Sequence, residues 1–463
     1  MKKTIFCFVF IVTTIVLLAQ ENKPLLILSI DASSGLSEID LTKYSLGQGG
    51  LSSKPMIDDL MVPLKQLHPK TIRFFIQEYF NLYPAHGKYN WEILDKTIEA
   101  IVATGARPIP DICFKPAVLF PKLDQNDVTP SSWKEWDELV FQLVMHCKEK
   151  KYGIEYWELG NEVETGESGG CPYKYTATNF LVFYKHTSDA ILKADPQAKI
   201  GGPGLAHMAH PLGDSLIGYC AKGNAPLDFF SWHGYSDNPE RFQKSIRDWR
   251  VKMAKYPLLK NTETMITEWN MDIFNPNLNP YFQPAYVLEM TNMFMEEGLS
   301  SSAYYHIRDY YVNSDEIGQF LSKPTVEMFS NMFNITPYMG LFDNQGRVRP
   351  AYFAFLCLSR MKGVKLNVEG VHGDIKALAV KSGDWINSVF WNFPATGNPG
   401  KESECNVKFS NIKDSSYRIM RLNPESSFNN LETIRYGQTR DLNANPLNIK
   451  LSPYEMFWIE IRP

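Results

Sequence analysis

The feature that most limits the possible folds is an alternation of strand-like and helix-like runs between residues 44 and 306. Short segments rich in β-branched, aromatic and aliphatic residues recur, and stretches with apolar residues at helical spacing separate them. The eight strand candidates are residues 44–48, 71–76, 107–114, 155–163, 198–203, 228–235, 264–270 and 301–306. Repeated strand, loop and helix is the unit of a parallel sheet, and eight such units predict a closed (β/α)8 TIM barrel.

Helices are expected between these strands, and an open sheet is the competing arrangement. The helical segments are residues 57–67, 91–103, 133–150, 180–194, 212–221, 239–256 and 286–297. An open doubly wound sheet would alternate in the same way. The sequence has no glycine-rich dinucleotide fingerprint to support that alternative, so closure is favoured.

The pattern changes after about residue 336. One more helix is expected over 350–361, and short runs broken by Gly, Asn, Ser and Pro follow it. These runs are residues 375–381, 385–392, 406–409, 417–422 and 457–461. Short strands with such turns predict an accessory C-terminal β-sandwich, which makes the fold class α/β with an all-β domain. We place the barrel at 21–340 and the sandwich at 341–463, while residues 24–34 join the barrel or pair with the sandwich.

The N-terminus predicts export. Lys2 and Lys3 precede an apolar run from Ile5 to Leu18, which is too short to span a bilayer as a helix. Residues 1–20 therefore resemble a cleaved signal peptide, and a retained N-terminal anchor is the alternative. The protein is expected to be secreted or periplasmic. No later stretch is long and apolar enough for a membrane span.

Composition narrows the partners. The formal net charge is −4 and the chain has no Lys/Arg block, which argues against nucleic acid. The seven cysteines are scattered without a CxxC pair, so zinc is not indicated and they look like individual buried thiols that cannot be paired from sequence. His207 and His210 lie three apart without an adjacent acidic partner. No metal and no cofactor are expected.

Two glutamates stand out because each ends a strand-like run. Glu162 lies in Gly160-Asn161-Glu162 on the fourth strand, and Glu268 lies in Thr267-Glu268-Trp269 on the seventh. Side chains at the C-terminal ends of barrel strands converge on one mouth. A pair of carboxylates there is what glycoside hydrolysis needs, with one as proton donor and the other as nucleophile or base. A slip of register would exchange Glu162 with its neighbours Glu158 and Glu164, and the preceding asparagine favours Glu162.

Four motifs in this order resemble clan A glycoside hydrolases, and family 39 most closely, over residues 24–463. They are Tyr156-Trp157-Glu158 through Asn161-Glu162, Ser231-Trp232-His233-Gly234-Tyr235, Ile266-Thr267-Glu268-Trp269-Asn270 and Arg349-Pro350-Ala351-Tyr352-Phe353. The resemblance implies a retaining enzyme that works by double displacement through a covalent glycosyl-enzyme intermediate. It implies that Glu162 is the acid/base and Glu268 the nucleophile. An oligosaccharide or polysaccharide of plant or host origin is the implied substrate, and the activity is β-xylosidase-like.

The sequence around Glu162 differs from the usual family 39 motif, so the sugar specificity is not determined. Family 39 usually has Trp-Asn-Glu-Pro at the acid/base, whereas this chain has Gly160-Asn161-Glu162-Val163. The Gly-Asn-Glu form also resembles the clan A arabinofuranosidases of family 51. An arabinofuranosidase-like hydrolase is therefore an alternative. A barrel that binds glycan without hydrolysing it is another, although a binder has no need of both glutamates.

Supporting residues are expected around the pair. Asn161 is placed to hydrogen-bond the 2-hydroxyl of the sugar. Arg73, on the second strand, is expected to pair with Glu268 and keep it ionised. His233 and Tyr235 alternate by two and share one face, and the resemblance directs both into the mouth, with Tyr235 toward Glu268. A nearby Glu268 carboxylate would raise the pKa of Glu162 and help keep it protonated.

Further subsite candidates are polar or aromatic residues near the strand ends, and each competes with a structural role. They are Gln77, Glu78, Lys115, Trp232, Trp269, Tyr305 and His306. Many clan members carry a tryptophan on the eighth strand as a sugar platform. Tyr304-Tyr305-His306 occupies that place here, so the platform is expected to differ.

Overall fold

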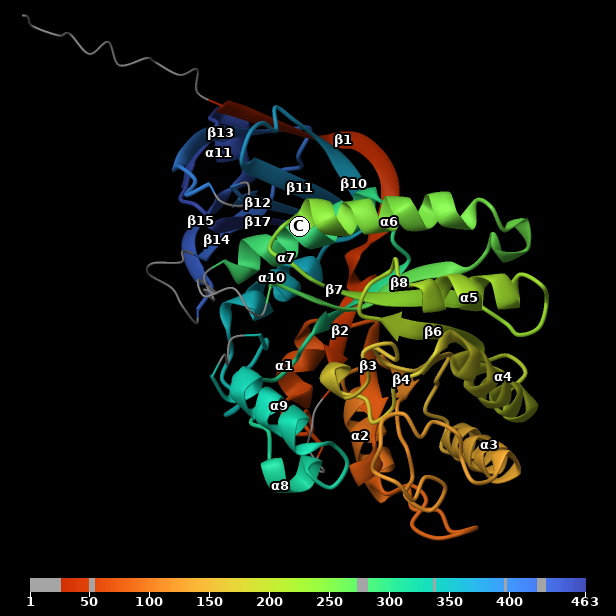
Figure 1. Ribbon diagram of the computed structural model, residues 1–463. Coiled ribbons are helices and arrows are strands. Elements are labelled where there is room, and N and C mark those ends of the chain that lie inside the picture. Colours follow the sequence, from red (N-terminus) through yellow and green to blue (C-terminus); the bar gives the residue numbers. More distant parts are fainter. Residues whose placement is uncertain (1–25, 50–54, 273–281, 336–338, 395–397, 423–429) are drawn as a thin grey trace, which may run out of the picture.

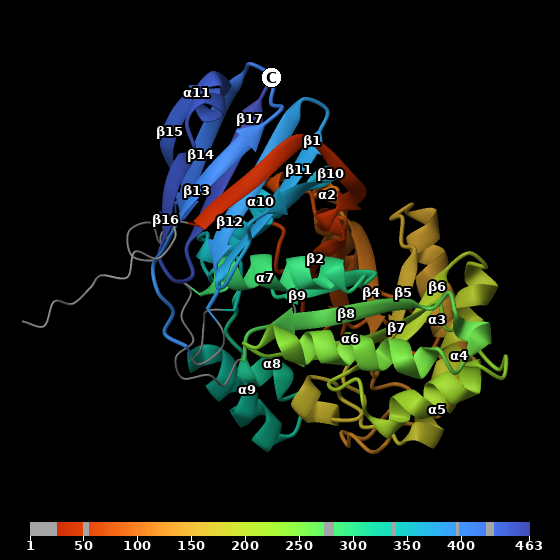
Figure 2. The ribbon, with the colours of Figure 1, turned by 90° about the horizontal axis from the view of Figure 1, so that it is seen from above.

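The structure, a computed structural model, describes residues 26–49, 55–272, 282–335, 339–394, 398–422 and 430–463. Within them, eight parallel strands close into a barrel, and a nine-stranded mixed sheet lies beside it (Figure 1). The view from above in Figure 2 shows this sheet as a separate layer next to the barrel. The proposed signal peptide lies outside the described residues.

The barrel strands confirm the predicted alternation. They are β2 (Tyr44–Gln48), β3 (Thr71–Ile76), β4 (Arg107–Ile112), β5 (Tyr156–Leu159), β6 (Lys199–Leu205), β7 (Phe229–Tyr235), β8 (Glu263–Asn270) and β9 (Ser301–Tyr305). Each strand pairs in parallel with its sequence neighbour, and β2 pairs with β9 to close the ring. Parallel barrel strands are buried on both faces, and for this reason their sequences are nearly continuous runs of apolar residues.

Eight helices surround the barrel, one after each strand. They are α1 (Met61–Gln66), α2 (Glu92–Ala103), α3 (Trp133–Glu149), α4 (Ala177–Ala194), α5 (Pro211–Cys220), α6 (Pro239–Met253), α7 (Gln283–Glu296) and α10 (Pro350–Leu358). Side chains cap several of them; the Ser132 hydroxyl, for example, accepts from Glu135 N at the start of α3. In α2 the buried Leu94, Ile98 and Ile101 form one stripe. Short 3-10 turns are η1 (Leu41–Lys43), η2 (Glu78–Phe80), η3 (Gly166–Gly169) and η4 (Pro257–Leu259).

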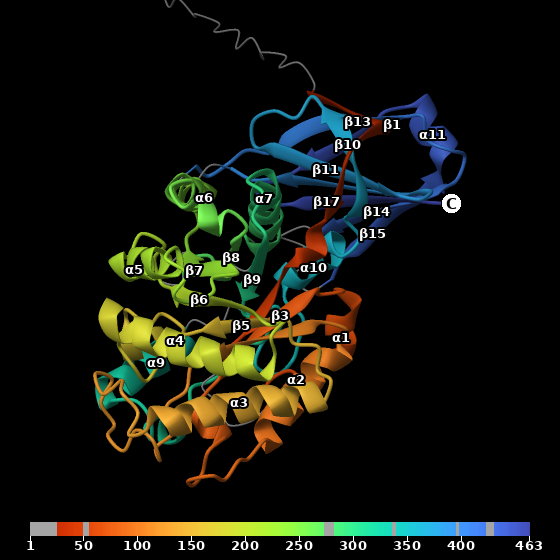
Figure 3. The same ribbon diagram turned by 90° about the vertical axis from the view of Figure 1, so that its right-hand side faces the viewer.

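Helix α10 belongs with the barrel although it follows residue 340. Its Phe355 ring packs on Tyr304 of β9 at 5.2 Å, and the Tyr352 hydroxyl donates to Pro63 O in α1. The helix also lies beside α7, between the barrel strands and the large sheet (Figure 3). Barrel packing therefore continues past the boundary that the change in sequence pattern indicated.

The mixed sheet has the order β15-β14-β17-β12-β11-β10-β1-β13-β16. Its strands are β1 (Leu26–Asp40), β10 (Lys362–Glu369), β11 (Ile375–Ser382), β12 (Trp385–Asn392), β13 (Ser403–Ser410), β14 (Ser416–Leu422), β15 (Glu432–Gln438), β16 (Leu447–Leu451) and β17 (Met456–Arg462), with α11 (Thr439–Ala444) before β16. Strand β1 runs antiparallel to β10 and parallel to β13. Residues 24–34 were expected in the barrel or beside the sandwich, and the described part, residues 26–34, lies in this sheet as part of β1. Strands β10, β15 and β16 were not expected from sequence.

Alternate side chains of the sheet face two different cores. Phe390 of β12 and Ile459 of β17 point into the sheet's own core, to which strands β1, β10, β11, β13, β14 and β16 also contribute. Trp391 and Trp458, one position away on the same strands, point into the core shared with the barrel. The Trp391 indole donates to Glu289 Oε2 of α7 at 2.9 Å. The two-residue period of a strand thus joins the sandwich to the barrel.

An insertion between β9 and α10 carries two helices that the sequence did not predict. Helices α8 (Ser314–Ile317) and α9 (Lys323–Ile335) pack around a small core of Val312, Ile317, Leu321, Val326 and Phe329. Both lie to one side of the barrel strands, away from the sandwich (Figure 1). Among the described residues, every helix is too short or too polar to cross a lipid bilayer.

Candidate active site

Glu162 and Glu268 meet at the C-terminal end of the barrel strands. Glu162 follows β5, and Glu268 lies near the end of β8. One carboxylate oxygen from each, together with a ring nitrogen of His233 on β7, lie within 4.8 Å of one another. Retaining glycosidases hold their two carboxyl groups about 5–5.5 Å apart, and inverting ones about 6.5–9.5 Å. Two oxygens within 4.8 Å leave less room between the carboxyls than an inverting enzyme needs for its water, which favours the retaining class.

The turn after β5 explains why glycine precedes Asn161. Gly160 has φ +95° and Glu162 has φ +43°, both in the left-handed region. A Cβ at Gly160 would lie 2.4 Å from Val163, so a larger residue does not fit this turn. The turn is held by Gly160 N, which donates to Asp111 Oδ1 at 3.1 Å, and by Glu162 N, which donates to Gly204 O at 2.7 Å. Tryptophan could not occupy this position in this backbone.

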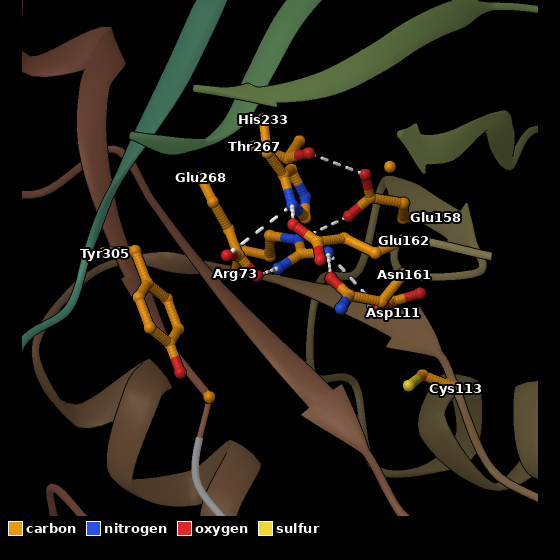
Figure 4. A network of polar contacts seen from close by, with 12 residues as sticks. Arg73, Asp111, Cys113, Glu158, Asn161, Glu162, His233, Thr267, Glu268 and Tyr305 are labelled. Carbon is orange, nitrogen blue, oxygen red and sulfur yellow. Dashed lines mark hydrogen bonds and ion pairs between the residues drawn. The ribbon is translucent and has the colours of Figure 1, made fainter. Parts of the chain in front are cut away.

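Arg73 connects the strand ends below the two glutamates (Figure 4). Its Nη1 donates to Glu268 Oε1 at 2.8 Å, so the ion pair expected from sequence is present. Its Nη2 donates to Asn161 Oδ1 at 2.8 Å and to Asp111 Oδ2 at 3.2 Å, and its Nε donates to Glu158 Oε2. We call these five residues the polar floor. Burial opposes charge on Arg73, but the Glu158, Asp111 and Glu268 carboxylates raise its pKa above the ordinary value, so the guanidinium stays cationic.

Glu158 and Glu164 face away from the reacting position. Glu158 Oε1 accepts from Ser231 Oγ at 2.6 Å and from Thr267 Oγ1 at 2.8 Å, inside the barrel. Glu164 accepts from Ala206 N at 2.7 Å. Only Glu162 of the three lines the cavity, which resolves the question of register in its favour.

Glu268 is surrounded by donors. Besides Arg73 on Oε1, the Tyr235 hydroxyl donates to Oε2 at 2.6 Å. Burial and the Glu268 charge raise the pKa of Tyr235 well above its ordinary value, so the phenol keeps its proton. These two donors occupy both oxygens of Glu268 and fix the orientation of its side chain.

Glu162 differs from Glu268 because, among the described residues, no cationic side chain donates a hydrogen bond to it. Its side chain is only 17% exposed, and burial raises the pKa of its carboxyl to about 7 against the opposing charge of Arg73. The sequence predicted this direction, but it ascribed the rise to the Glu268 charge, whereas burial is the cause. His233 Nδ1 and Glu162 Oε1 are hydrogen-bonded at 2.9 Å. Burial lowers the pKa of His233 to about 4, so the ring is neutral at pH 7 and adds no charge.

A cavity of about 350 Å³ opens above the two glutamates. It is lined by Phe75, Gln77, Asn161, Glu162, Ser168, Gly169, Gly170, Ala206, His207, Tyr235, Glu268, Asp272, Tyr305, Tyr310, Met328, Phe329, Met332 and Met339. Tyr305, at the end of β9, stands beside Glu268 (Figure 4). It thus lines the cavity at the place where tryptophan is usual.

Comparison with known proteins agrees with this geometry. The model of the glycosyl hydrolases family 39 matches residues 76–393. The chain belongs to this family. A β-xylosidase from Caldicellulosiruptor saccharolyticus is 26% identical over 308 residues, which cover 60% of this chain and 57% of that protein. A β-xylosidase from Geobacillus stearothermophilus is 23% identical over 49% of this chain and 50% of its own. The chain thus spans about half the length of the curated relatives it matches, 57% of the first and 50% of the second.

A solved structure extends the likeness of the fold. The crystal structure of a monomeric β-xylosidase from Caulobacter crescentus CB15 superposes with a TM-score of 0.73 at 18% identity, covering 95% of this chain and 99% of that one. The family 39 arrangement of a barrel with a β-sandwich therefore extends over both domains of this chain.

Some sequence candidates lie outside the cavity of this family 39 barrel. Trp232 packs on Trp249 of α6, and the Trp269 indole donates to Ser302 Oγ at 3.0 Å. Both point toward the helices because their neighbours His233 and Glu268 point inward. His306 is buried, with Nε2 at 3.1 Å from Asp309 Oδ1. These three candidates therefore occupy structural positions.

Glu78 and Lys115 also lie outside the cavity lining, whereas the neighbouring Gln77 is part of it. The Lys115 ammonium donates to Asp124 O at 2.7 Å and is mostly buried. Burial raises the pKa of Glu78 to about 8 against the opposing charge of Lys115. This pair is placed to hold the loops after β3 and β4 together.

Several lining residues were missed from sequence. Phe75 is the residue after Phe74 on β3, and the strand pattern could not show which of the two faces inward. Tyr310, Asp272 and the methionines belong to loops and to α9. The helical spacing of Val326, Phe329 and Met332 is the sequence signal from which α9 could have been predicted.

The cysteines correct another expectation. Cys113, just after β4, and Cys171 form a disulfide with a Cα–Cα distance of 6.2 Å. They are therefore not isolated thiols, and the bond ties the loop that carries Glu162 to the end of β4. The other described cysteines, Cys147, Cys220, Cys357 and Cys405, are free and buried.

The donors of Glu162, His233 and Glu268 are close enough together to hold a metal ion. Both oxygens of Glu268 already accept hydrogen bonds, one of them from the cationic Arg73. A divalent cation would therefore meet an existing positive charge and displace existing donors. His210 Nδ1 accepts from Leu212 N at the start of α5, while His207 lines the cavity, so these two histidines do not act together.

Proposed function

We propose that the protein is a retaining glycoside hydrolase in which Glu268 is the nucleophile and Glu162 the general acid/base. The observation that carries this proposal is the difference between two neighbouring carboxyl groups. Glu268 accepts from Arg73 and Tyr235, whereas burial raises the pKa of Glu162 to about 7. A buried carboxyl that holds its proton near neutral pH suits the acid, and a carboxyl with a donor on each oxygen suits the nucleophile.

The reaction proceeds in two displacements. Glu268 attacks the anomeric carbon while Glu162 gives its proton to the glycosidic oxygen, so the bond to the leaving group breaks and a glycosyl ester forms. Glu162, now ionised, takes a proton from water, and the resulting hydroxide attacks the same carbon and frees Glu268. Asn161 has one amide proton engaged with Gly169 O and a second available for the 2-hydroxyl of the sugar.

A β-xylosidase-like, exo-acting specificity fits best. The curated relatives that the chain matches are named β-xylosidases. The cavity of about 350 Å³ is near the lower end of the range of about 300–1,000 Å³ for ligand sites. A small pocket favours removal of a sugar from a chain end over cleavage within a polysaccharide.

The first test is a panel of aryl glycosides and oligosaccharides, with the anomeric form of the first product followed by NMR. We expect β-D-xylosides to be hydrolysed and a β product to form first. Glu268→Ala should abolish turnover, and azide should partly restore Glu162→Ala on an activated substrate. Full activity of Glu268→Ala, or an α product, would refute the assignment.

Two alternatives are separated by the same panel. The Gly160-Asn161-Glu162 sequence is the observation that favours an arabinofuranosidase-like enzyme, and this reading predicts faster hydrolysis of an α-L-arabinofuranoside than of a β-D-xyloside. A non-catalytic binder predicts a measurable affinity for xylo-oligosaccharides without release of sugar from any substrate.

We also propose that the enzyme is exported. The support is the basic and apolar pattern of residues 1–20. Expression of the full chain with its own N-terminus should yield protein outside the cytoplasm that begins near Gln20. Intact protein that keeps residues 1–20 in the cytoplasm would refute the proposal.

A further inference from the structure

One wall of the cavity lies on the side of Glu162. A Cβ at Gly169 would lie 2.5 Å from Glu162 Oε2, so this glycine touches the carboxyl. A Cβ at the next residue, Gly170, would lie 3.9 Å from the ring of Phe329 on α9. Glu162, the two glycines and Phe329 are therefore neighbours in space. Because the general acid protonates the leaving group, α9 borders the region where the leaving group sits.

This wall is apolar. Met328, Phe329 and Met332 of α9 all line the cavity, and we call them the apolar wall. Met328 is 38% exposed and lines the cavity, so its side chain is accessible to a ligand. Methionine is flexible and polarisable, and its sulfur makes favourable contacts with aromatic rings. The hydroxyl groups of a second sugar would find few partners on such a surface.

Helix α9 is fastened to the loop that carries Glu162. Glu167, five residues after the acid, accepts from Ser322 N at 3.1 Å, from Thr325 Oγ1 at 2.9 Å and from the Ser322 hydroxyl. The Glu167 amide in turn donates to Gln125 Oε1 at 3.0 Å. A carboxylate at the first turn also complements the helix dipole. The apolar wall is thus held at a defined position relative to the proton donor.

We propose that the apolar wall is a leaving-group subsite for an aromatic aglycone. The preferred substrates are then glycosides with an aryl or arylalkyl group, and not xylo-oligosaccharides. This inference rests on the proposed hydrolase function and adds the class of leaving group. The ring of the aglycone would pack between Phe329 and the methionine side chains while the sugar occupies the position above Glu268.

The test compares benzyl β-D-xyloside, methyl β-D-xyloside and xylobiose as substrates. Benzyl and methyl glycosides both release an alcohol, so the comparison isolates the ring. We expect kcat/KM for the benzyl glycoside to exceed that for the methyl glycoside by about tenfold or more, the effect of added apolar contact in a pocket. Phe329→Ala and Met332→Gln should each lower kcat/KM for the benzyl glycoside more than for the methyl glycoside, and so remove most of this advantage.

Val326→Ala is the matched control, because Val326 packs in the small core of the same insertion and does not line the cavity. It should keep the preference for the benzyl glycoside. Equal kcat/KM for benzyl and methyl glycosides, faster hydrolysis of xylobiose, or an equal loss in Val326→Ala would each overturn the subsite. If no xyloside is hydrolysed, the proposed function itself fails. Met332 is only partly buried, so its variant keeps the test decisive should Phe329→Ala not fold.

Discussion

The polar floor and the apolar wall enclose the same cavity but are built in opposite ways. The floor takes residues from the ends of several barrel strands, and Arg73 bonds to each of its other members. The wall comes from one inserted helix, which Glu167 holds at its first turn. From this difference we infer that the two regions have separate functions. The closed barrel determines the chemistry, while an insertion outside the barrel determines which leaving group is accepted.

The largest effect should come from the acid above the floor. Glu162→Gln is expected to lower kcat/KM for benzyl β-D-xyloside by about 10²–10⁴-fold, because general acid catalysis is lost. In the wild type, Glu162 must be protonated and its pKa is about 7, so kcat/KM should fall as the pH rises through 7. Both predictions are checked by measuring kcat/KM for the wild type and for Glu162→Gln between about pH 4 and pH 9, a range that brackets that pKa. A decline above pH 7 that persists in Glu162→Gln would show that another group is the acid.

The next effect tests whether the floor is one coupled unit. Arg73→Met leaves Glu158, Asp111 and Glu268 without their cation, and breaking a buried ion pair typically costs about 3–5 kcal/mol in the free energy of unfolding. Arg107→Met on the neighbouring strand breaks a more exposed pair with Glu155, and should cost under about 1 kcal/mol. Urea unfolding measures both. Similar losses in the two variants would mean that the floor is not coupled.

A smaller effect is expected at the attachment of the wall. Glu167→Gln weakens the bonds at the start of α9, so the free energy of unfolding should fall by about 1 kcal/mol. A loss of about 1 kcal/mol in binding corresponds to a few-fold change in affinity. KM for the benzyl glycoside should therefore rise a few-fold, while KM for the methyl glycoside is unaffected. Glu327→Gln, an exposed position on α9, is the control. Unchanged kinetics in Glu167→Gln would show that the position of the wall does not depend on this carboxylate.

The smallest effect concerns metal. Treatment with EDTA followed by dialysis should leave kcat unchanged, because Arg73 and Tyr235 already bond to the oxygens of Glu268. Activity that disappears on chelation and returns with one divalent cation would replace the acid/base account with metal-assisted hydrolysis.

The same two regions show how far the sequence could lead. Glu162 and Glu268 could be identified because each ends a run of buried residues, and the topology of a barrel brings such ends together. The candidates Trp232 and Trp269 could not be separated from cavity residues in the same way. Parallel strands are covered on both faces, so their sequences carry little information about which side chain points inward.

Other features depend on contacts between distant segments. The apolar wall needs α9 to fold back over the barrel, and the bond of Glu167 to Ser322 joins residues 155 positions apart. The disulfide between Cys113 and Cys171 leaves no signature in their spacing. Strand β15 was missed because most of its residues are exposed and show no alternation.

The central claim is that Glu268 becomes bonded to the sugar while Glu162 moves the proton. A 2-deoxy-2-fluoro-β-D-xyloside with an activated leaving group should slow the second displacement and trap the ester. Peptide mass spectrometry of the inactivated enzyme is predicted to place one glycosyl group on Glu268. A label on any other residue, or full turnover with an inverted product and no label, would contradict the account.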